Sequence, residues 1–200
     1  MTPERVAGVV LAAGQSTRMG RNKMLLEIGG RTLVRRAVTT AFAAGLDPVL
    51  VVVGHESDKV RGEVSGLPCT PVLNGEYASG MNTSLRAGIV ALPDDVAAAV
   101  VLLGDMPLVD AAMVRSLVEA LRRGNRPLAV SIYGDVVAPP IAYGRALFPE
   151  LRALTAEACG KSVIKRHRAE ATELRWPSET LTDLDEPADV QRIRSRLEAA

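Results

Sequence analysis

The sequence predicts an α/β protein built as a single three-layer α/β/α domain around a mostly parallel sheet. Short apolar runs rich in β-branched residues alternate along the chain with segments whose apolar residues recur at helical spacing. The runs show no polar–apolar alternation, so both of their faces should be buried, as in a parallel sheet that helices cover on both sides. A length of 200 residues suits one such domain.

Five runs have the length and composition of buried strands: Val6–Leu11, Val49–Val53, Thr70–Leu73, Ala97–Leu103 and Leu128–Ile132. Three segments between them have the apolar spacing of helices: Leu33–Ala44, Met81–Ala91 and Val114–Arg123. Gly45 and Gly124 stand where helix C-terminal stops are expected.

After Ile132 the pattern loosens, because Pro139 and Pro140 interrupt it. We expect further helices over Arg145–Leu154, Lys161–His167 and Ala188–Leu197. No internal repeat and no linker long enough to separate domains is evident, so residues 1–200 are expected to form one domain.

Composition excludes several classes of protein. With 48% hydrophobic and 24% charged residues the chain is neither disordered nor a coiled coil. A formal charge of +1 argues against broad binding to nucleic acid or to an anionic membrane, and the apolar runs are far shorter than the ~20 residues of a membrane span. The N-terminus lacks a signal-peptide layout, so we expect the protein to act in the cytoplasm. Two cysteines without CxxC spacing and two histidines exclude the usual zinc frameworks.

The residues that directly follow each strand are the first place to look for a site, because ligands of open parallel sheets bind beyond the carboxyl ends of the strands. The first strand leads into a loop of small residues followed by Arg18, Arg21 and Lys23. Backbone N–H groups and cations at this place would form a cradle for a polyphosphate. The alternative is an ordinary strand-to-helix turn with solvated basic residues.

Two carboxylates could form a metal site. Asp105 follows the strand that ends at Leu103, where a buried carboxylate needs a partner and a divalent cation would be a natural one. The alternative is that Asp105 caps the helix after Pro107. Asp185 stands just before the last expected helix and is either a cap or a second metal ligand.

A third segment, from Asn74 to Leu85, places small and polar residues at the start of a helix. Its N-terminus could face an anion or the edge of a base. Plain helix capping by Ser79 or Asn82 is the alternative.

Taken together, these segments resemble the family of nucleotidyltransferases that transfer a nucleotide to molybdopterin. The family pattern L-A-[AG]-G-x-[SA]-x-R-M-G-x-x-K is matched in full from Leu11 to Lys23, and the other segments follow in the same order. The sequence LAAG resembles the cytidylyltransferase branch, whereas the guanylyltransferase branch typically reads LAGG, which makes Ala13 the marker of base specificity. The stretch from Gly80 to Leu85 also resembles the cytidylyl branch.

The resemblance implies a Rossmann-like fold of the nucleotide-diphospho-sugar transferase type, CTP as donor, molybdopterin as acceptor and Mg²⁺ as cofactor. It implies that residues 1–125 bind the nucleotide and residues 126–200 bind the acceptor. The implied catalytic residues are Arg18, Lys23 and Asp105, and the implied metal ligands are Asp105 and Asp185. The implied nucleotide-binding residues are Leu11, Ala12, Ala13, Gly14, Arg18, Lys23, Asn74, Gly80 and Ser84.

The departures from the family fall in the expected acceptor half. A Gly-His-Pro element is replaced by Ala138-Pro139-Pro140, and a G-D-x-G-A-R element is replaced by the residues from Ala156 to Lys161. The acceptor-binding residues that we expect from these positions are Pro140, Glu157 and Lys161. A cytidylylated cofactor would pass to a molybdenum hydroxylase partner. Two alternatives stay open: transfer of another nucleotide, such as a guanylyl group, to another phosphorylated small molecule, and a non-catalytic protein that binds nucleotide or cofactor.

Overall fold

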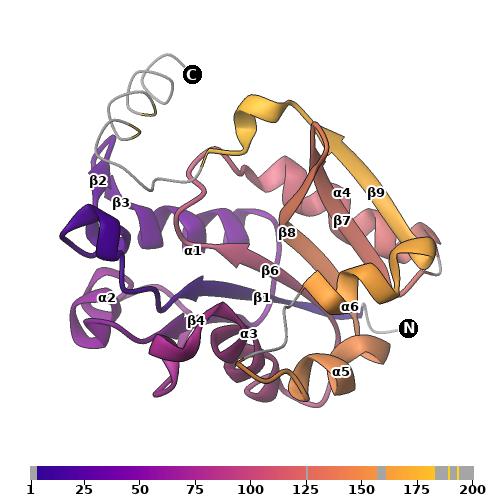
Figure 1. Ribbon diagram of the computed structural model, residues 1–200, viewed down its shortest axis with the longest axis horizontal. Coiled ribbons are helices and arrows are strands. Elements are labelled where there is room, and N and C mark those ends of the chain that lie inside the picture. The colour runs from indigo at the N-terminus through magenta and orange to yellow at the C-terminus, as the bar shows by residue number, and fades with distance from the viewer. Residues whose placement is uncertain (1–3, 125, 157–160, 183–188, 190–192, 194–200) are drawn as a thin grey trace.

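A computed structural model of the chain describes residues 4–124, 126–156 and 161–182, together with Asp189 and Ile193. Seven strands form one sheet in the order β5-β4-β1-β6-β8-β7-β9 (Figure 1). Their bounds are Arg5–Ala12 (β1), Val49–Val53 (β4), Thr70–Leu73 (β5), Val96–Leu103 (β6), Leu128–Tyr133 (β7), Val136–Gly144 (β8) and Ala171–Trp176 (β9). All pairings are parallel except those of β8 with β6 and with β7, which are antiparallel.

Helices cover both faces of the sheet, which confirms the predicted three layers. The elements α1 (Leu33–Ala43), α2 (Ser57–Glu63) and α4 (Ala111–Gly124) pack on one face. The elements α3 (Met81–Val90), α5 (Phe148–Arg152) and α6 (Lys161–Arg166) pack on the other. Figure 1 shows β1 between α1 on one side and α3 on the other. Among the described residues, no helix is long and apolar enough to cross a membrane.

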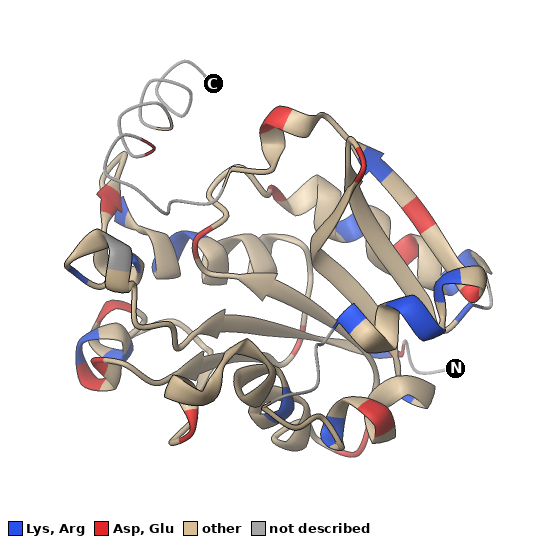
Figure 2. Ribbon diagram, viewed as in Figure 1, with Lys and Arg blue, Asp and Glu red and all other residues tan. Residues whose placement is uncertain are grey.

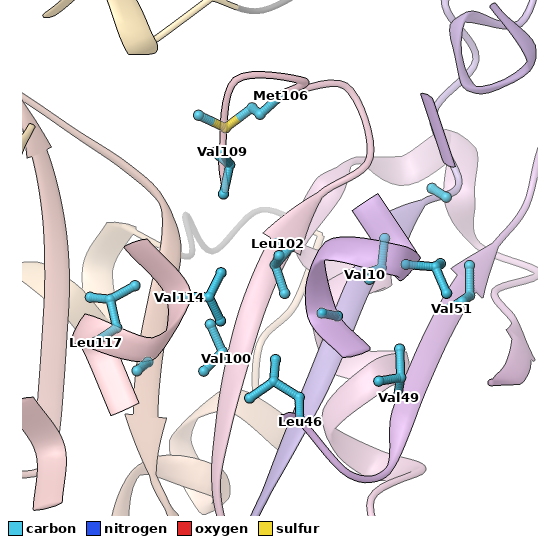
Figure 3. Packing of buried hydrophobic residues seen from close by; sticks show 14 of the residues in the cluster. Val10, Leu46, Val49, Val51, Val100, Leu102, Met106, Val109, Val114 and Leu117 are labelled. Carbon is cyan, nitrogen blue, oxygen red and sulfur yellow. The ribbon is translucent and has the colours of Figure 1, made fainter. Parts of the chain in front are cut away.

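Alternate residues of each central strand belong to opposite cores. Val10 of β1 and Val100 of β6 join the cluster beneath α1 and α4, whereas Val9 and Val101 join the cluster beneath α3 and α5. Figure 3 shows the first of these clusters, in which Val114 of α4 lies over the β6 strand near Val100. Because side chains of a strand point alternately to its two faces, β-branched residues at successive positions are all buried here.

The part of the sequence that follows β7 departs from the expectation. Strand β8 runs through Pro139 and Pro140, where the sequence suggested an interruption. The register slips at this point, since Val130 pairs with Ile141 but Ser131 pairs with Ala138. The two prolines therefore lie in a bulge, where a missing N–H costs no ladder hydrogen bond, and the Ser131 hydroxyl donates to the Pro140 carbonyl at 2.7 Å.

Several short elements were not foreseen. They are α2, β9, a hairpin of β2 (Glu27–Ile28) and β3 (Arg31–Thr32), and 3₁₀ turns of three residues at Thr17–Met19 (η1), Lys23–Leu25 (η2), Tyr77–Ser79 (η3), Arg168–Glu170 (η5) and Ser178–Thr180 (η6). The expected helix over Arg145–Leu154 is present as a 3₁₀ turn at Arg145–Leu147 (η4) followed by α5. Of the expected closing helix Ala188–Leu197, Asp189 and Ile193 are described and are helical, and the rest lies outside the described residues. Ile193 is fully buried in a small cluster with Leu26, Ile28 and Leu33, which fastens this part of the chain to the hairpin.

The topology brings the ends of β1 and β6 together. From β1 the chain passes to β4 and β5 on one side and returns to β6 on the other side of β1. The loops that leave the carboxyl ends of β1 and β6 therefore diverge, and a crevice opens between them, which is the usual place for a ligand in this type of sheet.

Candidate active site

The loop after β1 is shaped by backbone contacts with both neighbouring strands. The Gly104 N–H donates to the Leu11 carbonyl at 3.0 Å, and the His55 N–H donates to the Ala13 carbonyl at 3.3 Å. Beyond Gly14, Ser16 and Gly20 adopt left-handed backbone angles with φ of 53° and 65°. Ser16 and Gly20 stand on either side of the η1 turn, and their left-handed backbone angles turn the loop back toward the end of β6.

This fold places Lys23 against Asp105. The Lys23 ammonium forms an ion pair with Oδ2 of the Asp105 carboxylate, and the two side chains are only 15% and 12% exposed. The Asp105 carboxylate does not cap the following helix: Asp110 does so, because its Oδ1 accepts from the Met113 N–H at 2.8 Å. Asp105 thus lies just beyond the end of a strand, and a lysine from the neighbouring loop neutralises the charge of its carboxylate.

The lysine is held in place through its backbone. The Lys23 N–H donates to Ser16 Oγ at 3.0 Å. Asn22, which is 3% exposed, accepts from the Met24 N–H at 3.0 Å and donates to the His55 carbonyl at 3.2 Å. These bonds tie the η2 turn to both the β1 loop and the end of β4, so the position of Lys23 relative to β6 is fixed by the protein.

The start of α3 forms the opposite wall. Gly80 occupies the N-cap position with φ of 114° and without a side-chain hydrogen bond to the helix, so neither Ser79 nor Asn82 is the cap. The Asn74 side chain donates to Thr83 Oγ1 at 2.9 Å and to Ser84 Oγ at 3.0 Å, and it accepts from the Glu76 N–H at 2.9 Å. Asn74 therefore lies behind this wall and orients Ser84, and its amide is committed to protein partners.

A cavity of about 590 Å³ lies between these walls. Of the residues that the sequence assigned to nucleotide, metal or catalysis, seven line it: Leu11, Ala13, Gly14, Lys23, Gly80, Ser84 and Asp105. Ala12 instead faces the core beneath α1. The backbone of Arg18 lies in the η1 turn, and the side chain of Arg18 is outside the described part of the chain, as are Asp185 and Glu157.

A second cavity of about 310 Å³ adjoins the first. The two cavities share three wall residues, Leu11, Met81 and Leu103. Met81 is 61% exposed, which is unusual for a large apolar side chain and places it at the mouth of both cavities. The rest of the second cavity is mostly apolar and is walled by β6, by β8 and by α6, where Lys161 supplies a cation.

Pro140 directly follows Pro139, which is a wall residue of the second cavity. The Pro140 carbonyl accepts a hydrogen bond from the Ser131 hydroxyl. Burial raises the pKa of Tyr143, another wall residue, well above its ordinary value, so its hydroxyl stays protonated. Basic residues lie at both ends of α6 in Figure 2, whereas over the rest of this view acidic and basic residues are interspersed.

The sequence did not single out Gly54 and Tyr77, which shape the first cavity. A Cβ on Gly54 would lie 2.5 Å from Tyr77 Cβ and 2.9 Å from the Ala13 carbonyl oxygen. The absence of a side chain at the end of β4 thus lets Tyr77 approach the β1 loop, and Tyr77 lines the cavity. A glycine directly after a predicted buried strand is the signal that could have identified this position.

Most of the chain is similar to a known protein family. The model of the MobA-like NTP transferase domain family matches residues 8–171. Bifunctional protein GlmU from Clavibacter sepedonicus is 40% identical over 129 residues, which are 62% of this chain and 26% of that protein, so the chain spans about a quarter of the length of this relative.

Solved structures match over nearly the whole chain. The crystal structure of Rv0371c from Mycobacterium tuberculosis is 27% identical, with a TM-score of 0.84, and the match covers 97% of this chain and 100% of that one. A manganese complex of the same protein matches with a TM-score of 0.79 at 26% identity and covers 96% of this chain and 98% of that one. Molybdopterin-guanine dinucleotide biosynthesis protein A from Archaeoglobus fulgidus matches with a TM-score of 0.72 over 97% of this chain and 100% of that one, and at 15% identity this likeness concerns the fold alone.

Proposed function

Because the chain belongs to the MobA-like NTP transferase family, we propose that it transfers CMP from CTP to the phosphate of molybdopterin or a close relative and releases pyrophosphate. Proteins of this family are nucleotidyltransferases. The observation that carries the proposal is the pairing of Lys23 with Asp105 in the cavity between the ends of β1 and β6. A buried carboxylate and a cation at this point suit a site that handles a polyphosphate.

The proposed reaction is an in-line displacement. An oxygen of the acceptor phosphate forms a bond to the α-phosphorus of CTP while the bond from that phosphorus to the pyrophosphate oxygen breaks. A phosphate monoester is already anionic, so this attack needs no general base. Lys23 would neutralise charge on the triphosphate, and Arg18 would assist it from the η1 turn. The N–H groups of the β1 loop would hold the nucleotide in place.

The residues present fit a divalent cation. Mg²⁺ is typically held by one or two carboxylates together with substrate phosphates and water, and does not need an all-protein cage. Asp105 supplies one such carboxylate inside the cavity, and Asp185 is proposed as the second. Among the described residues, no group of three or more His, Cys, Asp and Glu side chains could hold a metal. When bound, the cation would supply neutralisation of the phosphate charge. The manganese complex of Rv0371c supports a divalent cation in this fold.

The residues that line the two cavities support the proposed nucleotide base and the proposed acceptor. Ala13, Gly80 and Ser84 would surround the cytosine nucleoside, because all three line the first cavity. The adjoining apolar cavity would take the body of the acceptor, with Lys161 and the segment at Pro140 and Glu157 near its phosphate side. The product would then be delivered to a molybdenum hydroxylase. This second cavity is mostly apolar, and its wall carries Pro139 where the family pattern has a histidine. The second candidate for the acceptor is therefore another phosphorylated molecule with an apolar body.

A thermal-shift panel tests the nucleotide preference without the acceptor. CTP, GTP, ATP and UTP are each added with and without Mg²⁺. A nucleotide at about 100 times its Kd should add roughly 2.7 kcal/mol to the stability, or about 5–10 °C in Tm. The expected result is a Mg²⁺-dependent shift that is largest for CTP. A largest shift with GTP would show that Ala13 does not mark cytidine, and no shift with any nucleotide would contradict the proposal. Pyrophosphate release on adding molybdopterin then separates a transferase from a binding protein.

A further inference from the structure

We propose that Tyr143 determines which molecule the second cavity accepts, because its hydroxyl forms a hydrogen bond with a polar ring atom of the bound molecule. The cavity would then favour a phosphorylated heterocycle over a phosphorylated hydrocarbon of the same shape. The inference rests on the proposed function, because it takes the second cavity as the place of the acceptor. It adds the residue that contacts the end of the acceptor farthest from the phosphate.

Tyr143 lies at the inner end of the second cavity. In the pairing of β6 with β8, Val101 is opposite Ile141, and Tyr143 comes one step farther in, opposite Ala99. Leu103, a wall residue that both cavities share, ends β6. Alternate residues of a strand point to the same face, so the steps from Leu103 through Val101 lead away from the first cavity and toward Tyr143. An acceptor whose phosphate reaches the nucleotide therefore has its opposite end near Tyr143.

The hydroxyl of Tyr143 is available to a ligand. Within the described part of the chain it forms no hydrogen bond, although the residue is only 2% exposed. The unpaired side-chain atoms of the described residues that are sealed from solvent are Thr32 Oγ1, Arg36 Nε and Trp176 Nε1. The Tyr143 hydroxyl is not sealed in this way, so it opens onto the cavity that Tyr143 lines.

The other polar side chains in the described wall of this cavity have different roles. Asn82 donates to the Ala156 carbonyl at 3.4 Å. Lys161 is exposed and carries a positive charge that suits a phosphate. Tyr143 is therefore the buried polar group that can contact the body of the acceptor.

Filling the cavity makes this hydroxyl important for specificity. A cavity of about 310 Å³ has room for water, which can satisfy the hydroxyl in the free protein. A ligand that fills the cavity displaces this water and must replace its hydrogen bond, because a buried hydroxyl without a partner is costly. Since burial keeps the hydroxyl protonated, it can donate to a ring nitrogen or a carbonyl oxygen, and a hydrocarbon has neither.

Probes that differ in one ring atom test the inference. They are naphthylmethyl phosphate and two quinolylmethyl phosphates, one with the ring nitrogen remote from the phosphate and one with the nitrogen near it. Titration calorimetry measures the Kd of each probe for the wild-type protein and for Tyr143→Phe, which removes only the hydroxyl. We expect the wild type to bind the remote-nitrogen probe about tenfold more tightly than the other two, and this preference to disappear in Tyr143→Phe.

Ile141→Val controls for the shape of the cavity, because it shortens an apolar wall residue and leaves the hydroxyl in place. It should weaken all three probes alike and keep their order. Neither residue lines the first cavity, so both variants should bind CTP with Mg²⁺ as the wild type does. Circular dichroism melts establish that each variant is folded. If Tyr143→Phe does not fold, the order of the three probes in the wild type decides.

A preference for the remote nitrogen that is lost in Tyr143→Phe and kept in Ile141→Val supports the inference. Equal affinities for the three probes in the wild type, or no binding of any of them, would overturn it. A preference that Tyr143→Phe leaves unchanged would also overturn it. The proposed function is decided separately, by the thermal shift with CTP and by pyrophosphate release. If the probes bind as expected but no pyrophosphate is released, the proposed function fails and the cavity is still a site for a phosphorylated heterocycle.

Discussion

At the scale of single residues, two glycines beside the same cavity differ in the space that is available for a side chain. A Cβ on Gly54 would lie less than 3.0 Å from the Ala13 carbonyl oxygen and from the Cβ and Cγ atoms of Tyr77. Among the described residues, and apart from its two chain neighbours, a Cβ on Gly14 would meet no atom within 4 Å, and Gly14 lines the cavity. Gly54 is therefore required by the packing of the protein, whereas the space beside Gly14 is available to a ligand.

This contrast predicts different effects of the same substitution. Gly14→Ala should change the free energy of unfolding by less than about 0.5 kcal/mol but weaken binding of the nucleotide, because the methyl group projects into the cavity. Gly54→Ala should cost about 1–3 kcal/mol of stability, because Ala13 and Tyr77 must shift. Urea denaturation and nucleotide titration of both variants measure these effects. Normal nucleotide affinity in Gly14→Ala would contradict a close approach of the ligand to this loop.

The roles of individual site residues were only partly predictable. Leu11, Gly14, Lys23 and Asp105 could be identified because each lies at the end of a buried strand or in the loop that follows one. The structural role of Asn74 could not, because its three hydrogen bonds depend on how Thr83, Ser84 and Glu76 are brought to it by the fold. For the same reason the sequence offered two roles for Asp105. The fold excludes the capping role, because Asp110 caps the following helix, and metal binding by Asp105 stays a prediction.

At the scale of secondary structure, the chain follows its sequence pattern closely as far as β7, and α5 and α6 also lie within predicted helices, whereas β8 and β9 were not predicted. The predicted strands and helices up to Arg123 are confirmed, because parallel strands buried on both faces leave an uninterrupted apolar pattern. Strand β8 is antiparallel and carries two prolines in a bulge, and β9 alternates in burial at the edge of the sheet. Such strands have patterns that local sequence alone does not distinguish from loops.

The short helices α5 and α6 are joined by an ionic contact that makes their stability depend on pH. The Glu150 carboxylate contacts His167 Nε2 at 2.7 Å and also pairs with Arg166. The hydrogen bond with His167 is the main reason that the pKa of Glu150 lies below its ordinary value of 4.5. A carboxyl group whose pKa is lowered by folding stabilises the protein above its unfolded value, and this contribution is lost as the pH falls through the folded value.

We therefore expect Glu150→Gln to melt at a lower temperature than the wild type at neutral pH, and the difference to vanish as the pH falls to about 3. The effect at neutral pH should be below about 1 kcal/mol, because the carboxylate is partly solvated. Thermal melts of both proteins between neutral pH and about pH 3 give the comparison. Glu119→Gln, which removes a surface ion pair with Arg123, serves as the control. A difference between Glu150→Gln and wild type that persists at low pH would contradict this account.

At the scale of the whole molecule, the two halves of the chain share their cores. The cluster beneath α1 and α4 includes Val10 of β1 and Ala129 of β7, and the opposite cluster includes Val9 and Val130. Strand β8 also pairs directly with β6 across the boundary between the halves. We expect one cooperative unfolding transition, because neither half can expose its share of these clusters without disrupting the other.

The single tryptophan of the chain makes this expectation measurable. Trp176 ends β9, at the edge of the sheet that belongs to the second half, and packs against the cluster beneath α1 and α4. Its fluorescence and the far-ultraviolet circular dichroism of the whole chain should change with the same midpoint of denaturation. A fluorescence change at clearly lower denaturant would mean that the second half unfolds separately, against a single domain.

The shared wall of Leu11, Met81 and Leu103 also bears on how such a protein can diverge. All three belong to the first half of the chain, which walls the larger cavity. Among the described residues, those that the second half contributes, such as Val137, Ile141 and Ile164, wall the smaller cavity alone. With the nucleotide in the larger cavity and the acceptor in the smaller one, as proposed above, mutations in β8 and α6 would change the acceptor without disturbing the binding of the nucleotide. One sheet would then carry a nucleotide specificity that is retained and an acceptor specificity that varies.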